Sequence, residues 1–174
     1  EMAPVALIHA LAEIANGYGC GRDMHVGDTI IGIKGRVGFE AAAPLIIIKA
    51  HHMLEKHTLV KEQLYWKELI ANYYGQLMHE AQYLNPVMRD MEKFLESTQA
   101  SVNGTVDVLL RPYDFCVLGC TSQFDRMSSK FGEYGEMNKS YTGRDVVGFT
   151  KVLSNPLKIY YSLHEDEKEK ASKN

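Results

Sequence analysis

Apolar residues recur at helical spacing from the start of the chain. Pro4 stands where a first helical position would be, and the apolar positions after it fall three or four residues apart. Asn16 and Gly17 then end the pattern. We predict a first helix from Pro4 to about residue 16, and its apolar stripe consists of Leu7, Ile8, Leu11, Ile14 and Ala15.

The next segment, residues 17–38, contains seven glycines. Such a density indicates tight turns or a close approach of the backbone to another group. Its centre, residues 29–33, reads Thr-Ile-Ile-Gly-Ile and is rich in β-branched side chains. We predict a short strand there.

Three longer helices are predicted between residues 44 and 98. Pro44 begins the first, which passes through His52 and Glu55 and ends near His57. The second runs from about residue 60 to residue 79, and the third begins where Asn85 caps a helix with proline at its first position. The inward stripes are Leu64, Leu69, Tyr73 and Leu77 in the second helix and Val87, Met91, Phe94, Leu95 and Thr98 in the third.

The hydrophobic period then changes from 3.6 residues to two. Val106, Val108 and Leu110 alternate with other residues, residues 111–114 read as a turn, and residues 115–118 form the partner strand. Residues 123–144 are polar and lack a period, so we expect loops with at most one short strand. Asn155 caps a last helix, which carries the apolar residues Leu157, Tyr160, Tyr161 and Leu163 and ends in a charged tail.

These elements predict an α+β fold, with a small, mainly antiparallel sheet packed by four longer helices. We assign residues 1–154 to one domain and residues 155–174 to a C-terminal helical arm for oligomerisation, followed by a charged tail. The arm would place its apolar stripe on a neighbouring subunit. The alternative is that the stripe packs on its own domain.

Composition narrows the function classes. The 174 residues carry a net charge of -3, with 19 Lys and Arg that are dispersed along the chain, so we expect no nucleic-acid partner. The longest apolar run, residues 41–48, is too short to cross a bilayer. Three cysteines, an odd number, favour reduced thiols and a cytoplasmic protein. The chain also enters a helix at once without a leader, as we expect of a piece cut at a domain boundary.

The residues by themselves define no catalytic group and no metal site. The glycines at positions 17, 19 and 21 lack the Lys-Ser/Thr of a P-loop. His51 and Glu55 are four residues apart and could form a His/Glu pair, but we expect a capped or solvent-facing helix end instead.

Charged residues are concentrated among glycines in residues 32–40, just before a predicted helix. They are Lys34, Arg36 and Glu40. Such a loop can bind an anionic or zwitterionic small molecule, and the alternative is an ordinary strand-turn-helix corner with a Lys/Arg–Glu ion pair.

Several short motifs in a fixed order resemble the argininosuccinate synthases. The likeness spans roughly residues 4–163, and residues 21–51 keep the family's spacing without an insertion. The matching residues are Gly21-Arg22, the run from Gly32 to Arg36, Phe39-Glu40, Ala50-His51, Leu54-Glu55, Asn85-Pro86, Thr98-Gln99, the run from Val102 to Val106, Asp145 and Gly148-Phe149.

The resemblance implies a function. Argininosuccinate synthases join citrulline to aspartate in arginine biosynthesis, using ATP with Mg²⁺ and releasing AMP and pyrophosphate. An N-terminal domain with a Ser-Gly-Gly-x-Asp-Ser loop binds the ATP, and that loop does not occur in this chain. The resemblance therefore implies a C-terminal part that supplies some of the citrulline pocket and much of a homotetramer contact. By itself it would be inactive, with no catalytic residue and no metal ligand.

Two positions depart from the family at its substrate contacts. The family's Glu for the citrulline α-amino group is matched by Gly27, and its Tyr hydroxyl by Phe39. The candidate substrate-binding positions are therefore Gly27, Phe39, Lys34, Arg36 and Glu40.

Three explanations of these departures stay open. Asp28 could replace the lost carboxylate, although on a strand its side chain would point to the opposite face. The substrate could be an N-acylated citrulline, whose acyl group, if carboxylated, Lys34 or Arg36 would receive. Or the chain could be a non-catalytic assembly module that has lost substrate binding.

Overall fold

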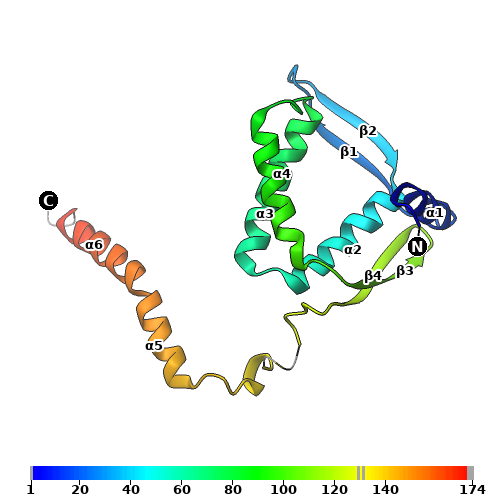
Figure 1. Cartoon of the computed structure of the whole chain (residues 1–174). Coiled ribbons are helices and arrows are strands. Elements are labelled where there is room, and N and C mark those ends of the chain that lie inside the picture. Colours follow the sequence, from blue (N-terminus) through cyan, green and yellow to red (C-terminus); the bar gives the residue numbers. More distant parts are fainter. Residues whose placement is uncertain (1, 129, 131, 172–174) are drawn as a thin grey trace. The chain divides into compact units, whose positions relative to one another are not determined.

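The structure, a computed structural model, describes residues 2–128, 130 and 132–171. It divides into two compact units, Glu1–Met127 and Ser128–Asn174, which are described separately. The elements of the first unit (Figure 1) are α1 (Pro4–Asn16), β1 (Arg22–Asp28), β2 (Lys34–Glu40), α2 (Ala42–Thr58), α3 (Lys61–His79), α4 (Pro86–Thr98), the 3₁₀ turn η1 (Gln99–Ser101), β3 (Thr105–Arg111) and β4 (Asp114–Thr121). The predicted α+β class is confirmed. The described strands form two separate antiparallel hairpins, β1–β2 and β3–β4, rather than one small sheet.

The first hairpin corrects the predicted strand at residues 29–33, which form its turn. Gly32 has a φ of +82°, and its N–H donates to the Thr29 carbonyl oxygen at 2.9 Å. Ile30 and Ile31 are 81% and 79% exposed at the tip. A left-handed glycine reverses the chain here, and that geometry overrides the strand propensity of the β-branched side chains around it.

The small core of the first unit lies where α2 meets α1 and the β3–β4 hairpin. α2 begins two residues before the predicted Pro44, which a first helical turn tolerates because its N–H groups have no intrahelical partner. The Cys20 thiol donates to the Asp114 carbonyl oxygen at 3.1 Å, so the loop after α1 holds the turn of the second hairpin. The core residues are Ala15, Cys20, Ala42 and Ile46, flanked by Leu11, Val108, Leu110 and Phe115.

α3 and α4 pack against each other (Figure 1). The cap of α4 is confirmed, because Asn85 Oδ1 accepts the Val87 N–H at 3.2 Å. The α4 stripe is also half-buried or buried as predicted, although its most buried member, Met88, lies outside the predicted set.

The inward stripe predicted for α3 is partly wrong. Leu77 is buried, but Leu69 and Tyr73 are 47% and 50% exposed. The inward face carries polar side chains instead: Tyr74 donates to Glu92 Oε1 at 2.9 Å, and Lys67 reaches α2. Apolar spacing cannot locate a helix face that packs through polar pairs.

Glu55 on α2 is the only charged residue that is fully buried among the described residues, with 0% exposure. Lys67 Nζ on α3 donates to its Oε2 at 2.8 Å, and Gln99 Nε2 on η1 donates to its Oε1 at 2.9 Å. The predicted solvent-facing helix end is therefore wrong for this residue. The carboxylate ties α2 to α3 and to the end of α4.

The pKa of Glu55 follows from these contacts. Burial raises the pKa of the carboxyl, but the hydrogen bonds from Lys67 and Gln99 and the nearby charges of Lys67 and His51 outweigh burial. The pKa of Glu55 consequently lies below its ordinary value of 4.5. The group is a carboxylate at neutral pH.

Two motif glycines are required by close backbone contacts. A Cβ at Gly21, where φ is +75°, would lie 2.6 Å from the Ala42 backbone. A Cβ at Gly104 would lie 2.1 Å from the Thr121 carbonyl oxygen. Both positions therefore exclude a side chain on steric grounds, and the positive φ of Gly21 disfavours one as well.

The second unit contains the 3₁₀ turn η3 (Gly135–Met137) and the helices α5 (Gly143–Leu153) and α6 (Asn155–Ala171). Sequence reasoning missed α5 and assigned its first residues to a loop. The available signal was the capping box, in which the Thr142 N–H donates to Asp145 Oδ2 at 2.8 Å. The predicted boundary at Ser154 falls between the two helices and stays a prediction.

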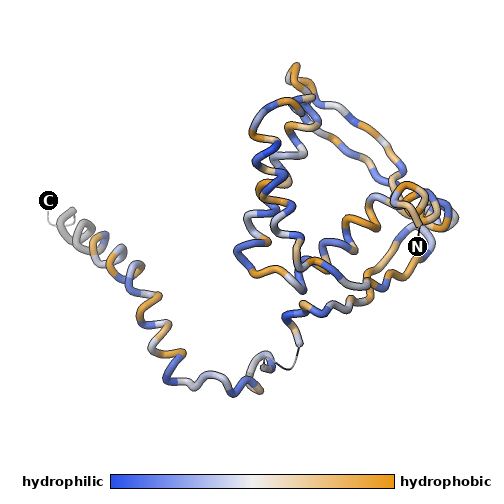
Figure 2. The backbone as a smooth tube through the Cα atoms, viewed as in Figure 1, coloured by the Kyte–Doolittle hydropathy of each residue, from blue (hydrophilic) through white to orange (hydrophobic). Residues whose placement is uncertain are grey.

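The two helices carry apolar side chains that their own unit does not cover. Figure 2 shows hydrophobic positions recurring along both. Each residue of the predicted α6 stripe is more than half exposed, as are several on α5. Across the described residues, no helix is both long and apolar enough to span a bilayer.

Replacing Glu55 should destabilise the first unit. Glu55→Gln leaves the Lys67 ammonium, which is 20% exposed, without its counter-charge, so we expect a loss of about 3 kcal/mol in the free energy of unfolding. The matched control, Glu68→Gln, alters a half-exposed carboxylate on α3 and should cost less than about 0.5 kcal/mol. Urea unfolding of the 174-residue chain measures both.

The destabilisation caused by Glu55→Gln should depend on pH. Because the pKa of Glu55 is lowered on folding, its contribution is present above pH 4.5 and is lost as the pH falls through the folded pKa. The stability difference between wild type and Glu55→Gln should therefore shrink below pH 4.5. A difference that stayed constant down to pH 3 would contradict the assigned charge state.

Candidate functional site

The pleat of the β1–β2 hairpin sorts the candidate residues onto two faces. Gly27 pairs with Gly35, His25 with Val37 and Asp23 with Phe39, and these six residues share one face. Lys34, Arg36 and Glu40 lie on the other. The five candidate positions are therefore not brought together, because Gly27 and Phe39 point to the opposite side from the three charged residues.

The charged face is occupied by ion pairs. Lys34 Nζ lies 2.5 Å from Asp28 Oδ1, directly across the hairpin, and Arg22 Nε lies 2.9 Å from Glu40 Oε1. All four side chains are more than half exposed. The Asp28 side chain is on the face opposite position 27, in agreement with the strand argument. This face resembles the ordinary ion-paired corner, which was the alternative to a ligand-binding loop for residues 32–40.

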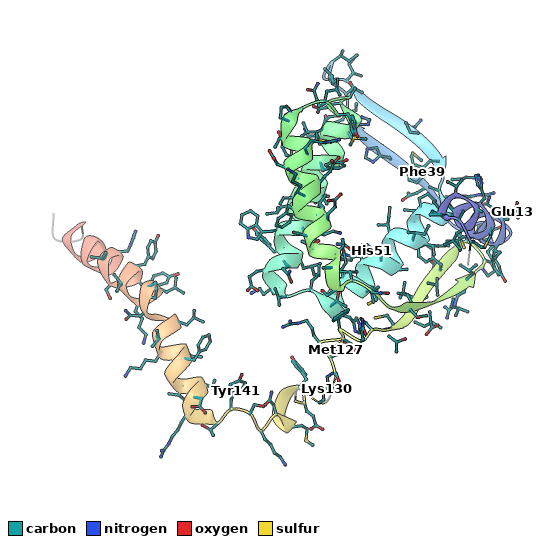
Figure 3. All side chains as sticks on the ribbon, viewed as in Figure 1. Glu13, Phe39, His51, Met127, Lys130 and Tyr141 are labelled. Atoms are coloured by element: carbon teal, nitrogen blue, oxygen red, sulfur yellow. The ribbon has the colours of Figure 1, made fainter. Side chains whose placement is uncertain are left out.

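The other face is the more covered one, since Gly27, Gly35 and Phe39 are half-buried. Phe39 lies at the base of the hairpin (Figure 3), and the Gly27 pair lies about 13 Å further along the strands, four residues at about 3.3 Å each. A surface hollow of about 370 Å³ at the base is lined by Arg22, Asp23, Gly38, Phe39 and Glu40.

His25 covers the glycine at position 27. A Cβ at Gly27 would lie 2.5 Å from His25 Nε2, so the imidazole occupies the space that a longer residue at position 27 would use. The His25–Val37 pair also lies between the Gly27 pair and the Phe39 pair. Sequence reasoning missed His25, although the two-residue period of a strand places it on this face once the strand bounds are known.

Asp23 is the one acidic side chain on this face of the hairpin. Its Oδ1 accepts the Met24 N–H at 2.7 Å, a local hydrogen bond within β1. It stands opposite Phe39 and therefore about 13 Å from Gly27. Position 27 has no carboxylate beside it on its own face.

Three further motif residues, His51, Glu55 and Gln99, are joined by hydrogen bonds within the first unit. His51 Nε2 lies 2.8 Å from Gln99 Oε1, and the same Gln99 amide donates to Glu55. The Ala-His and Leu-Glu motifs of α2 therefore meet the Thr-Gln motif after α4. Within the described part of the chain, no group of three or more His, Cys, Asp or Glu side chains is arranged to hold a metal ion.

The fold and the hairpin define an α+β domain whose candidate ligand-binding surface is an open strand face. A model of the arginosuccinate synthase C-terminal domain matches residues 1–160. The chain belongs to the argininosuccinate synthase family, through its C-terminal domain.

Curated relatives carry the same family name. The chain is similar to an argininosuccinate synthase of Dictyoglomus turgidum, with 32% identity over 86% of this chain. It is 31% identical to one of Dehalococcoides mccartyi over 97% of this chain, and 32% identical to one of Halalkalibacterium halodurans over 96%. These alignments cover 37%, 42% and 41% of the relatives, so the chain spans about two fifths of their length.

A methyl group at position 27 should displace the His25 ring without unfolding the hairpin. In Gly27→Ala the added Cβ meets the far end of one flexible side chain, so the free energy of unfolding should change by less than about 0.5 kcal/mol. NMR contacts between the His25 ring protons and residue 27 should be lost or rearranged. The control is Gly38→Ala, where a Cβ meets nothing within 4 Å, and His25 contacts that changed equally there would contradict the geometry.

Proposed function

We propose that this chain is the C-terminal part of an argininosuccinate synthase-type ligase of arginine biosynthesis. In the proposed reaction, the ureido oxygen of a citrulline attacks the α-phosphorus of ATP and releases pyrophosphate. The amine of aspartate then attacks the activated carbon and AMP leaves. Membership of the family over residues 1–160 supports this reaction class.

ATP and its Mg²⁺ would bind to a nucleotide-binding part outside this chain. The relatives are more than twice as long as the matched region, which leaves room for such a part in proteins of this kind. The chain itself would contribute one wall of the citrulline pocket and an oligomer interface. By itself it should therefore form no AMP.

We further propose that the citrulline is N-acylated. This proposal is supported by two residues on one face of β1–β2. Gly27 and Phe39 stand where the family resemblance implies a carboxylate and a phenol. A buried ammonium without a partner is costly, whereas acylation turns it into a neutral amide. Asp28 offers no replacement, since it pairs with Lys34 on the opposite face.

Lys34 and Arg36 were the sequence-based candidates to receive an acyl carboxylate, and Glu40 a further substrate contact. Lys34 and Glu40 have ion-pair partners on the charged face, and Arg36 lies beside them. We therefore propose Gly27 and Phe39 as the substrate-facing positions. The three charged residues lie on the opposite face of the hairpin and would then not contact the substrate.

The substrate can be identified by assaying the full-length enzyme with citrulline, N-acetylcitrulline and N-succinylcitrulline and measuring AMP and pyrophosphate. We expect kcat/KM for an acylated substrate to exceed that for citrulline roughly ten- to hundred-fold. This ratio corresponds to the one charged hydrogen bond that the ammonium of free citrulline would lack in this pocket. Gly27→Glu with Phe39→Tyr should shift the preference toward free citrulline. A wild-type preference for free citrulline would sink the acylation proposal.

The second candidate function is a non-catalytic assembly module, which the exposed apolar side chains of α5 and α6 favour. It predicts self-association without turnover of any citrulline derivative. The same assay separates it from the ligase, because an assembly module would release neither AMP nor pyrophosphate.

The proposed oligomer is a homotetramer in the cytoplasm, held partly by the arm at residues 155–174. Leu157, Tyr160, Tyr161 and Leu163 are each more than half exposed in the chain and would be buried on a neighbouring subunit. A chain truncated before Asn155 should sediment as a smaller species than the full chain. An unchanged oligomeric state after truncation would reject the arm.

A further inference from the structure

We propose that His25 recognises the acyl group of the substrate, and that this acyl group ends in a carboxylate. The inference rests on the proposed function and makes it more specific, because it names a dicarboxylic acyl group. It is carried by the position of one side chain on the β1–β2 face. Neither the family match nor the names of the relatives assigns a role to this residue.

The His25 ring lies over the glycine at position 27. His25 Nε2 would be 2.5 Å from a Cβ at position 27, so the imidazole fills the space above Gly27. Its cross-strand partner is Val37, and the pair stands between the two positions that depart from the family. A ligand group that passes from Gly27 toward Phe39 must pass His25.

This face of the hairpin has few polar side chains. Of its six residues, His25 alone has a side-chain N–H to donate, since the others are two glycines, Val37, Phe39 and the carboxylate of Asp23. Asp23 accepts a hydrogen bond from its own strand, at the far end of the face from Gly27. The group best suited to position 27 is therefore a hydrogen-bond acceptor, and a carboxylate is a stronger acceptor than a carbonyl oxygen because its negative charge strengthens the hydrogen bond.

The lysine and the arginines of the hairpin lie on its other face. Lys34 pairs with Asp28 and Arg22 pairs with Glu40, both on the charged face. Arg36 is on that face too, across from Val26. A carboxylate that extends over Gly27 would thus meet an imidazole before any lysine or arginine of this hairpin.

The glycine at position 27 and the histidine at position 25 depend on each other, because the ring occupies the space that a side chain at position 27 would fill. A glutamate at position 27 would push the ring away, and its carboxylate would compete with the ligand for the ring nitrogen. The glycine thus lets the ring lie over position 27 with its N–H available to a ligand. The loss of a carboxylate and the presence of the imidazole change the face from one suited to an ammonium to one suited to a carboxylate.

The test compares wild type, His25→Ala, His25→Gln and Arg36→Ala in the full-length enzyme, with N-succinylcitrulline and N-acetylcitrulline as substrates. His25→Ala should raise KM for N-succinylcitrulline roughly ten- to hundred-fold, with kcat within about twofold because the reacting ureido group is not touched. KM for N-acetylcitrulline should change less than about threefold. His25→Gln keeps a side-chain N–H donor without the imidazole ring, so its KM for N-succinylcitrulline should fall between those of wild type and His25→Ala.

Arg36→Ala is the matched control, since it removes a cation from the other face of the same hairpin. Its KM for both substrates should equal that of wild type, and all variants should keep the wild-type unfolding midpoint because His25 and Arg36 are exposed. A loss confined to Arg36→Ala, or an unchanged KM in His25→Ala, overturns the role of His25 while leaving the ligase proposal intact.

Other outcomes separate the two proposals. A wild-type enzyme that uses only free citrulline overturns both the acylated substrate and the role of His25. If no citrulline is turned over, the ligase proposal fails, and calorimetric titration of N-succinylcitrulline into wild type and His25→Ala decides the role of His25. Weaker binding to the variant supports that role, and equal binding or none to wild type overturns it.

Discussion

The carboxylate of Glu55 is fully buried and charged, and it stays so because Lys67 and Gln99 reach it from two other elements. Burying that charge without a partner would cost more free energy than the fold contributes to stability. The interaction therefore fixes α3 and the end of α4 against α2. Because α2 also packs on α1 and on the second hairpin, it connects all the helices of the first unit.

The motifs that carry the family resemblance separate into two groups in the structure. His51, Glu55 and Gln99 form a hydrogen-bonded framework around one buried carboxylate, and Gly21 and Gly104 permit close backbone contacts. Gly27 and Phe39, where the resemblance implies a carboxylate and a phenol, share one open face of the hairpin. Under the proposed function, the framework would be maintained while the surface that meets the substrate is altered.

The pleat of β1–β2 decides which residues share a face with Gly27. Alternation sends the cations and their acidic partners to one side and leaves the other with glycines, apolar side chains, one imidazole and one distant carboxylate. A sequence in which Lys34 and Arg36 stand close to Gly27 suggests that they act together. The geometry of a strand separates them, because neighbouring residues point to opposite faces.

The sequence by itself determined the elements whose signals are local: the capped helix α4, the β3–β4 hairpin with its period of two, and the α+β class. It could not locate the turn at residues 29–33, because the conformation of Gly32 decides that reversal. It misassigned the inward face of α3, since polar pairs with α2 and α4 hold that face, and it missed α5, whose apolar side chains lack a covering partner in their own unit. Tertiary structure alone placed the His25 ring over Gly27 and brought Glu55 to Gln99, 44 residues away along the chain. Such contacts depend on strand register and helix packing, and no periodicity within one segment encodes them.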